Sequence, residues 1–261
     1  MILSVKNLSV SNKEKIIIEN ISFDLKKNSC LGILGESGSG KSITCKAIMG
    51  LLDDNFKVNG EIQFNGDKLE NSNSKNIIGK EICMIIQNPM TAFNPLFNIE
   101  NQLVETILTH KNTSKVDAIN IILDSFEKMN LRDGNSLLKK FPHELSGGML
   151  QRIMIALTIS LEPSIIIADE PTTAIDVVNQ IEIIKELKKI RNILKSSIIF
   201  VSHDLSILNQ ISDEIIVMNQ GKIIEKGLFK DIISNPREIS TKELIDTRFK
   251  LINRFKELVE G

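Results

Sequence analysis

A glycine-rich loop between a short apolar run and a helical pattern is the feature that most restricts the fold of this chain. Cys30–Leu34 predicts a buried strand, and the residues from Ser42 to about Leu52 predict a helix. The loop Gly35–Ser42 joins them with the pattern Gly-x-x-x-x-Gly-Lys-Ser. Glycines let successive backbone N–H groups turn inward around an anion, and a helix N-terminus adds a favourable dipole. This context predicts a phosphate-binding loop, with a plain flexible turn as the alternative.

The side chains of this loop indicate ATP and Mg²⁺ as ligands. In a nucleotide site of this type, Lys41 supplies a point charge for the β- and γ-phosphates, and the hydroxyl of Ser42 reaches the magnesium ion. The loop residues that we expect to bind ATP are Gly35, Glu36, Ser37, Gly38, Ser39, Gly40, Lys41 and Ser42.

A second apolar run ends in two acidic residues. Ile165–Ala168 predicts a buried strand, and Asp169 and Glu170 follow it directly. We expect Asp169 to hold Mg²⁺ through water and Glu170 to orient or deprotonate the attacking water. An acidic pair that is solvated or that caps the following helix is the alternative. The phosphate loop upstream favours the catalytic interpretation.

A third segment, Leu145–Arg152, indicates that the active site is shared between subunits. Ser146 is typical of a helix N-cap, and the glycines at 147 and 148 let an anion approach the first helical turn. The chain already has a phosphate loop for its own nucleotide. A second anion site therefore predicts contact with the γ-phosphate of an ATP that another subunit holds. A plain helix start is the alternative.

The remaining pattern predicts an α/β protein with two additions to its sheet. Residues 2–25 alternate between apolar and polar, as in antiparallel strands. Strand, helix and strand over residues 165–201 indicate a parallel sheet covered on both faces, and residues 215–226 indicate a hairpin. Residues 88 to about 160 carry a capping box at Ser114 and Asp117 and apolar spacings of three and four, which predict an inserted helical lobe. We expect one domain over residues 1–246 and a helical tail over 247–261.

Composition restricts the class of partner and the compartment. The net charge of −1 with 25% charged residues leaves no polybasic surface for nucleic acid. Cys30, Cys45 and Cys83 lack metal-ligand spacing, which fits free thiols in a reducing compartment. The sequence contains neither an apolar run long enough to span a membrane nor a secretory signal. These features predict a cytosolic globular protein.

The whole chain resembles the ATP-binding subunits of ABC transporters. Gly35–Ser42 matches the Walker A pattern, and Ile165–Glu170 matches the Walker B pattern. The family signature is matched by Leu145, Ser146, Gly147, Gly148 and Gln151. Three further family positions are occupied by Gln87 (the Q-loop glutamine), Asp176 (the D-loop) and His203 (the switch histidine).

The resemblance implies a fold and a set of roles. The fold is a P-loop NTPase core whose parallel sheet is flanked by helices, with an antiparallel β subdomain and an inserted helical lobe. Gln87 would contact Mg²⁺ and the attacking water and would sense the membrane subunit. His203 would contact the γ-phosphate. Gln87 and His203 thus join Glu170 as expected catalytic residues, and Ser42, Gln87 and Asp169 are the expected magnesium ligands.

The resemblance also implies an assembly. Two ATPase subunits, identical or homologous, would close on two ATP molecules and drive two transmembrane permease subunits. The chain would lie at the cytoplasmic face of the cell membrane. An extracytoplasmic solute-binding protein would act indirectly, and no nucleic acid would be involved.

The segments Gln87–Pro95 and Phe141–Met149 resemble the peptide/nickel branch of importers. Dipeptide and oligopeptide members usually continue further and carry a cysteine cluster, whereas this chain has no cysteine beyond Cys83. The segments Gly35–Lys46 and Met149–Arg152 resemble the short nickel and metal–metallophore subunits. We therefore expect a metal ion, such as nickel, or a metal–metallophore complex as cargo. Import of dipeptides or oligopeptides is the alternative.

Two other classes of protein also use a phosphate loop and are alternatives to a transport ATPase. Soluble ABC ATPases of DNA repair or translation typically carry two cassettes, a long coiled-coil insertion or a basic face, and the sequence shows none of these. A small-molecule kinase would use the phosphate loop but would leave Leu145–Arg152 without a role.

One departure from the family pattern predicts weak selectivity for the base. The family usually stacks the adenine on an aromatic residue of the N-terminal hairpin, but Ser11–Ile18 contains none, and the adenine is left to rest on Ile16 or Ile17. Loss of stacking on an aromatic ring costs about 1 to 3 kcal/mol. Competition of GTP against bound ATP should therefore show similar affinities. A preference for ATP above about a hundredfold would contradict this prediction, because it would show that another contact binds the adenine selectively.

Overall fold

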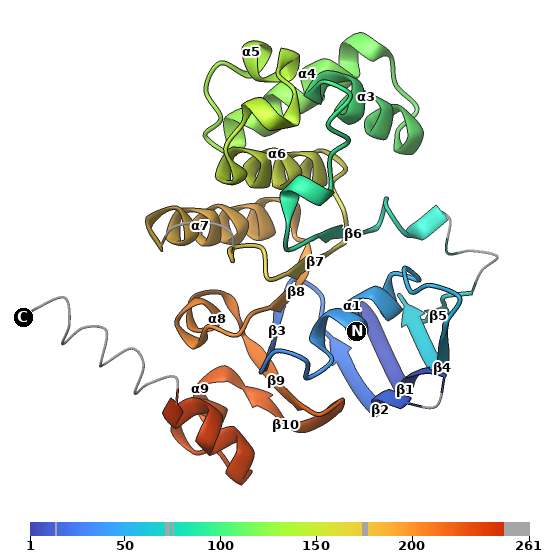
Figure 1. Ribbon diagram of the computed structural model, residues 1–261, viewed down its shortest axis with the longest axis vertical. Helices are drawn as coiled ribbons and strands as arrows, with labels where there is room; N and C mark the ends of the chain where they lie inside the picture. The colour runs from blue at the N-terminus through green and yellow to red at the C-terminus, as the bar shows by residue number, and fades with distance from the viewer. Residues whose placement is uncertain (14, 71–73, 75, 174–176, 248–261) are drawn as a thin grey trace, which may run out of the picture. The chain divides into compact units, whose positions relative to one another are not determined.

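The computed structural model describes the chain except residues 14, 71–73, 75, 174–176 and 248–261. The chain forms two compact units (Figure 1). The first comprises residues 1–69 together with the described residues from Ile199 onwards, and the second comprises Glu70–Ile198.

The first unit contains a four-stranded antiparallel sheet. Its strand order is β2-β1-β4-β5, and Leu3, Val5, Leu8 and Val10 are buried on one face of β1. This burial accounts for the alternation in the sequence and confirms the predicted antiparallel strands. The strands are β1 (Leu3–Asn12), β2 (Lys15–Leu25), β4 (Phe56–Phe64) and β5 (Asp67–Lys68).

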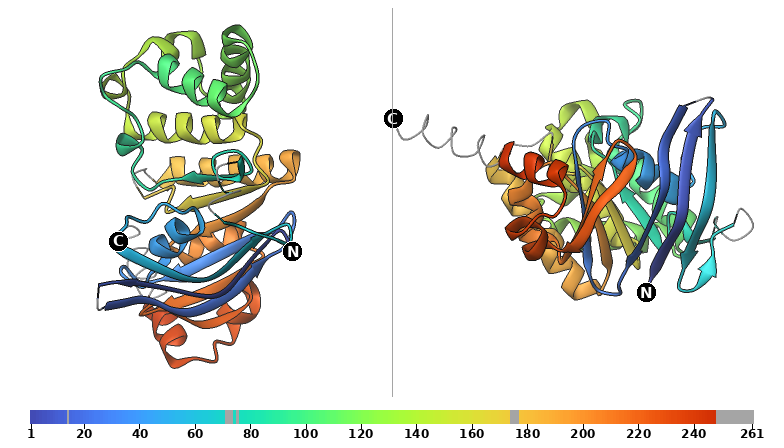
Figure 2. Two further views of the ribbon diagram at one scale, coloured as in Figure 1. Left: turned by 90° about the vertical axis from the view of Figure 1, so that its right-hand side faces the viewer. Right: turned by 90° about the horizontal axis from the view of Figure 1, so that it is seen from below.

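The first unit also contains the strand that leads into the glycine-rich loop. This strand, β3, pairs in parallel with β9, and β9 pairs antiparallel with β10. Gln220 and Gly221 form the turn of this hairpin with φ angles of 46° and 79°, so the predicted hairpin is confirmed. The elements are β3 (Cys30–Gly35), α1 (Lys41–Ile48), α8 (Leu205–Ile211), β9 (Glu214–Asn219), β10 (Lys222–Leu228) and α9 (Phe229–Ser234), which packs on β10 (Figure 2).

Helix α1 is shorter than the sequence predicts. It ends at Ile48 rather than near Leu52, because Gly50 has φ +63°. The N–H of Gly50 donates to the carbonyl of Ala47, and the N–H of Leu51 donates to the carbonyl of Lys46. These bonds form a Schellman motif, which stops the helix although apolar residues continue.

In the second unit, two buried parallel strands lie side by side. Strands β6 (Ile82–Ile85) and β7 (Ile165–Asp169) pair from Ile82 opposite Ile165 to Ile85 opposite Ala168. Helix α7 (Val177–Leu194) follows, and β8 (Ser197–Val201) runs into the first unit. The predicted parallel sheet is thus confirmed in both units.

Helices make up most of the second unit between β6 and β7 (Figure 1). The Oγ of Ser114 accepts a hydrogen bond from the N–H of Asp117, so the predicted cap of α4 is confirmed. The elements are η1 (Pro89–Thr91), α3 (Ile99–His110), α4 (Lys115–Lys128), α5 (Gly134–Lys139), η2 (Pro142–Glu144) and α6 (Gly147–Ser160). The domain limits predicted at residues 88, 160 and 246 stay predictions, and the predicted tail lies almost wholly outside the described residues.

The cysteines agree with the prediction of free thiols. Cys30, Cys45 and Cys83 are free and buried. Burial, with a smaller effect of the nearby Glu81 carboxylate, raises the pKa of Cys83 to about 12. Within the described part of the chain, we find no helix with the length and apolarity needed to cross a bilayer.

Candidate functional site

The glycine-rich loop presents the N-terminus of α1 without a side-chain cap. Gly40 is the N-cap residue of α1 with φ +103°, and Gly38 has φ +80°. These left-handed conformations favour glycine and turn the loop N–H groups to one side. The buried ammonium group of Lys41 donates to the carbonyls of Gly35 at 2.9 Å and Glu36 at 2.8 Å. The ammonium group of Lys41 therefore lies against the loop carbonyls, and phosphate binding by this loop stays a prediction.

The turn of the β9–β10 hairpin holds this loop against β2. The N–H of Gly221 donates to the carbonyl of Ser39 at 3.0 Å, and the carbonyl of Gly221 accepts from the N–H of Glu19 at 2.9 Å. A Cβ on Gly40 would lie 2.4 Å from Cδ1 of Ile18. The loop is thus fixed from outside by backbone bonds to segments that are distant in the sequence.

The region without an aromatic residue lies on β2, in the same unit as this loop. Ile16 is 61% exposed, Ile17 is partly exposed and Ile18 is buried. An aliphatic surface is therefore available at Ile16 and Ile17, as the predicted weak selectivity for the base requires.

His203 follows β8 and belongs to the same unit as the loop. The N–H of Ser202 donates to the carbonyl of Ile33 on β3 at 3.2 Å, and the Oγ of Ser202 accepts from the N–H of Asp204 at 2.9 Å. These bonds fix the backbone on both sides of His203, whose side chain is partly exposed. The histidine is thus held at the end of a strand whose exit is bonded to β3.

In the second unit, the parallel pairing of β6 and β7 brings Gln87 to Glu170. Both residues lie just beyond the carboxyl ends of their strands. The Nε2 of Gln87 donates to the Oε2 of Glu170 at 3.1 Å. Asp169, the last residue of β7, is 5% exposed. The structure thus brings together two residues that are 83 positions apart in the sequence.

Thr173 also holds Glu170, and the sequence pattern gave no reason to select it. Its Oγ1 donates to the Oε2 and the carbonyl oxygen of Glu170, both at 3.1 Å. Glu170 has φ +45°, which is uncommon for a residue other than glycine. A threonine three residues after a carboxylate at a strand end would have been the signal. The predicted D-loop residue Asp176 lies outside the described residues.

The signature segment begins α6 as predicted. Ser146 is the N-cap residue, and its Oγ accepts from the N–H of Met149 at 3.3 Å. A Cβ placed on Gly147 or Gly148 would have no neighbour within 4 Å. Neither glycine has a side chain that would shield the first amides of α6, which lack partners within the helix, so an anion can approach them.

The residues before this cap are held by Glu144. Its carboxylate accepts from the N–H of Phe141 at 2.8 Å, and this bond is the main cause of the lowered pKa of Glu144. Gln151 is buried, and neither of its side-chain amide atoms has a hydrogen-bond partner among the described residues. The predicted contact of Gln151 with a nucleotide stays a prediction.

Comparison with protein families gives a match over most of this chain. A model of the ABC transporter family matches residues 18–173. The metal-staphylopine import system ATP-binding protein CntD of Staphylococcus aureus is 38% identical over 265 residues, which cover 100% of this chain and 98% of that protein. The dipeptide transport ATP-binding protein DppD of Bacillus subtilis is 42% identical over 253 residues, which cover 94% of this chain and 76% of that protein.

Solved structures show the same fold. The protein cbiO1 from Clostridium perfringens, part of the ABC transporter complex cbiONQ, matches with a TM-score of 0.78 at 24% identity and covers 100% of this chain and 99% of its own. The dimeric bacterial ABC transporter cassette MJ0796 matches with a TM-score of 0.76 at 25% identity and covers 87% of this chain and 98% of its own.

The tie between the glycine-rich loop and the hairpin predicts a specific loss in the variant Gly221→Ala. A left-handed residue other than glycine costs about 1 to 2 kcal/mol. The added Cβ would also lie 2.1 Å from the carbonyl oxygen of Ile17. We expect a lower thermal midpoint and weaker ATP binding, because the Ser39 carbonyl loses its fixed donor. Calorimetry and titration with ATP measure the two effects.

Gly66→Ala is the matched control for this experiment. Gly66 also has a positive φ of +95°, but its added Cβ would have no neighbour within 4 Å. This variant should carry the backbone strain alone and keep its affinity for ATP. Equal losses of ATP affinity in both variants would show that the hairpin does not support the loop.

Proposed function

The chain belongs to the ABC transporter family and is the ATP-binding subunit of an importer that hydrolyses ATP to drive transport, and from this premise we propose a catalytic assignment, an assembly and a cargo. The observation that carries the catalytic assignment is the hydrogen bond from Gln87 to Glu170 at the ends of two adjacent parallel strands. It fixes the one carboxylate that directly follows the buried Asp169.

We propose that Glu170 is the general base. The Oε2 of Glu170 accepts hydrogen bonds from both Gln87 and Thr173. A carboxylate held in this way loses little orientational freedom when it accepts a proton from the attacking water. Gln87 keeps a side-chain amide beside the same water. His203, at the exit of β8, is proposed to donate to the γ-phosphate, and Lys41 is proposed to neutralise the β- and γ-phosphate oxygens.

The donor set fits Mg²⁺. Asp169 offers a buried carboxylate, Ser42 a hydroxyl at the start of α1 and Gln87 an amide oxygen, and Mg²⁺ prefers such oxygens together with substrate phosphates. When bound, Mg²⁺ would neutralise charge on the β- and γ-phosphates.

Two ATPase subunits, identical or homologous, are proposed to share their active sites. Ser146 caps α6, Gly147 and Gly148 carry no side chain that would shield its first amides, and a helix N-terminus of this kind binds a phosphate group. We propose that the γ-phosphate of the partner's ATP occupies this position. The dimeric MJ0796 cassette, which has the same fold, supports a paired arrangement.

The segment after Gln87 is proposed to contact a permease subunit. Met90, Leu96 and Phe97 are 49%, 79% and 51% exposed. Apolar side chains grouped within eight positions of the chain favour a protein partner. The subunit would then lie at the cytoplasmic face of the membrane, held by two permease subunits, with an extracytoplasmic binding protein delivering the cargo.

We propose a transition-metal ion or a metal–metallophore complex as cargo. The metal-staphylopine relative matches this chain along its whole length, and the segments Gly35–Lys46 and Met149–Arg152 support the same subgroup. Dipeptide import is the second candidate, and the 42% identity to the dipeptide transport protein favours it.

Glu170→Gln tests the catalytic assignment. Glutamine keeps the shape of the side chain but accepts no proton, so the variant should bind ATP normally and lose about 10²- to 10⁴-fold in turnover. It should also trap a closed pair of ATPase subunits, which gel filtration detects. Glu127→Gln, an exposed change in the same unit, serves as the control. Hydrolysis near the normal rate in Glu170→Gln would refute the assignment.

Uptake in cells that lack the gene tests the cargo. We expect uptake of radioactive nickel or cobalt, supplied free and as a metallophore complex, to fall while uptake of a labelled dipeptide is unchanged. Complementation with the normal gene should restore metal uptake, and complementation with Glu170→Gln should not. Unchanged metal uptake together with lost dipeptide uptake would overturn the metal assignment in favour of the second candidate.

A further inference from the structure

Arg152, in the second turn of α6, joins three elements of the second unit. Its guanidinium group donates to the Oε2 of Glu182 at 2.7 Å and to the Oε1 of Glu186 at 2.9 Å, both on α7. It also donates to the carbonyl of Met129, the C-cap residue of α4, at 3.2 Å. The Arg152 side chain is only 12% exposed. One arginine thus connects the signature helix to the end of α4 and to α7.

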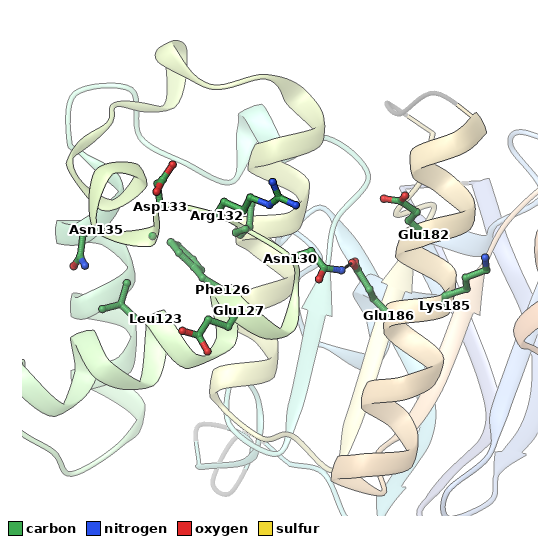
Figure 3. Close-up of a pocket in the computed structure, with 12 residues that line it drawn as sticks. Leu123, Phe126, Glu127, Asn130, Arg132, Asp133, Asn135, Glu182, Lys185 and Glu186 are labelled. Carbon is green, nitrogen blue, oxygen red and sulfur yellow. Dashed lines mark hydrogen bonds between the residues drawn. The ribbon is translucent and has the colours of Figure 1, made fainter.

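Asn130 completes this group from the end of α4. Its φ of +53° is left-handed, which asparagine tolerates better than most residues, and its Nδ2 donates to the Oε1 of Glu186 at 2.7 Å. Figure 3 shows Asn130 and Glu186 pointing toward each other from the loop after α4 and from α7. One carboxylate oxygen therefore accepts from both an amide and a guanidinium. Arg152, Asn130, Glu182 and Glu186 are called the Arg152 cluster below.

Stability is a poor explanation for the Arg152 cluster. Glu186 is buried, and its Oε2 has no hydrogen-bond partner among the described residues. Removing such charges from water costs several kcal/mol, and apolar replacements are often neutral or stabilising. Burial raises the pKa of Glu186 in spite of the opposing effects of Asn130 and Arg152. The contribution to stability therefore does not explain why these charged residues lie together here.

The hydrogen bonds of the Arg152 cluster can instead fix the orientation of α6. The rest of the buried face of α6 is mostly apolar, with Leu150, Ile153 and Ile155 among its residues, and apolar contacts do not fix direction. A guanidinium that donates to two carboxylates and a carbonyl does fix direction. Ser146, Gly147 and Gly148 are the first residues of the same helix, so any rotation or shift of α6 moves their amides.

We propose that Arg152, held by Glu182 and Glu186, is a positioning residue that sets the Ser146–Gly148 anion site and thereby the rate of ATP hydrolysis at the partner's Walker A loop. This inference rests on the proposed sharing of the site between two subunits. It assigns roles to Arg152, Glu182 and Glu186 in which none of them touches the nucleotide. Displacement of reacting groups by about 1 Å costs roughly a hundredfold in rate, which sets the scale of the effect.

The test compares variants in the importer assembled with its permease subunits and second ATPase subunit. Arg152→Lys keeps the charge but loses the fork, Arg152→Met loses both, and Glu186→Gln keeps an acceptor oxygen but loses the charge. Lys185→Gln, an exposed change on α7 next to Glu186, is the matched control. Four quantities are measured: kcat, KM for ATP, the affinity for a fluorescent ATP analogue and the thermal midpoint.

We expect kcat to fall about 10- to 100-fold in Arg152→Met and less in Arg152→Lys, with Glu186→Gln also reduced. The affinity for the ATP analogue should stay close to normal in all variants, because the subunit's own Walker A loop is intact. The thermal midpoint should fall in Arg152→Met, which leaves Glu186 buried without its cation, and should stay close to normal in Arg152→Lys and Glu186→Gln. Lys185→Gln should match the normal protein in all four measurements. A normal kcat in Arg152→Met would overturn the inference.

Other outcomes would also overturn it. Parallel losses of kcat, ATP affinity and thermal midpoint in Arg152→Lys and Glu186→Gln would indicate a purely structural role. The companion variant Ser146→Arg separates this inference from the shared site on which it rests. If Ser146→Arg is inactive while the Arg152 and Glu186 variants are active, only the positioning role fails. If Ser146→Arg is fully active, the shared site fails and the positioning role fails with it.

Discussion

The parallel pairing of buried strands is the constraint on which the candidate catalytic site depends. Residues 82–85 of β6 pair with residues 165–168 of β7 in register, and this register alone brings Gln87 within 3.1 Å of Glu170. A shift of one residue would reverse the faces of every side chain on the shifted strand, and both strands are largely buried. The hydrophobic core therefore fixes the geometry of two polar side chains that contribute nothing to that core.

The two helix N-termini assigned to phosphate binding keep their first amides available to an anion in different ways. Helix α1 has Gly40 as its N-cap residue and no side-chain cap, so its first amides stay available inside the loop. In helix α6 the hydroxyl of Ser146 caps the N–H of Met149, while Gly147 and Gly148 carry no side chain over the first amides. A fully capped helix would be more stable, but it would offer an anion fewer donors.

Buried charge is used in two ways in this protein. Lys41 bonds to the carbonyls of its own loop, where its ammonium group lies among the predicted phosphate ligands. Arg152 bonds to two carboxylates and a carbonyl on other elements, away from the open amides of α6. A point charge suits phosphate neutralisation, whereas a planar fork suits the orientation of helices. The two residues are therefore not interchangeable, although both are cationic.

The motifs, the strand periods, the cap at Ser114 and the hairpin turn at Gly221 could be predicted from the sequence, because each depends on residues only a few positions apart. The sequence nevertheless predicts too long a helix α1, because apolar residues continue beyond Ile48. Gly50 stops the helix through its backbone conformation. The contacts between distant residues became known from the fold: Gly221 with Ser39, Gln87 with Glu170 across 83 positions and Arg152 with Glu186 across 34. Such contacts depend on how whole strands and helices pack, and no local period or turn preference encodes that packing.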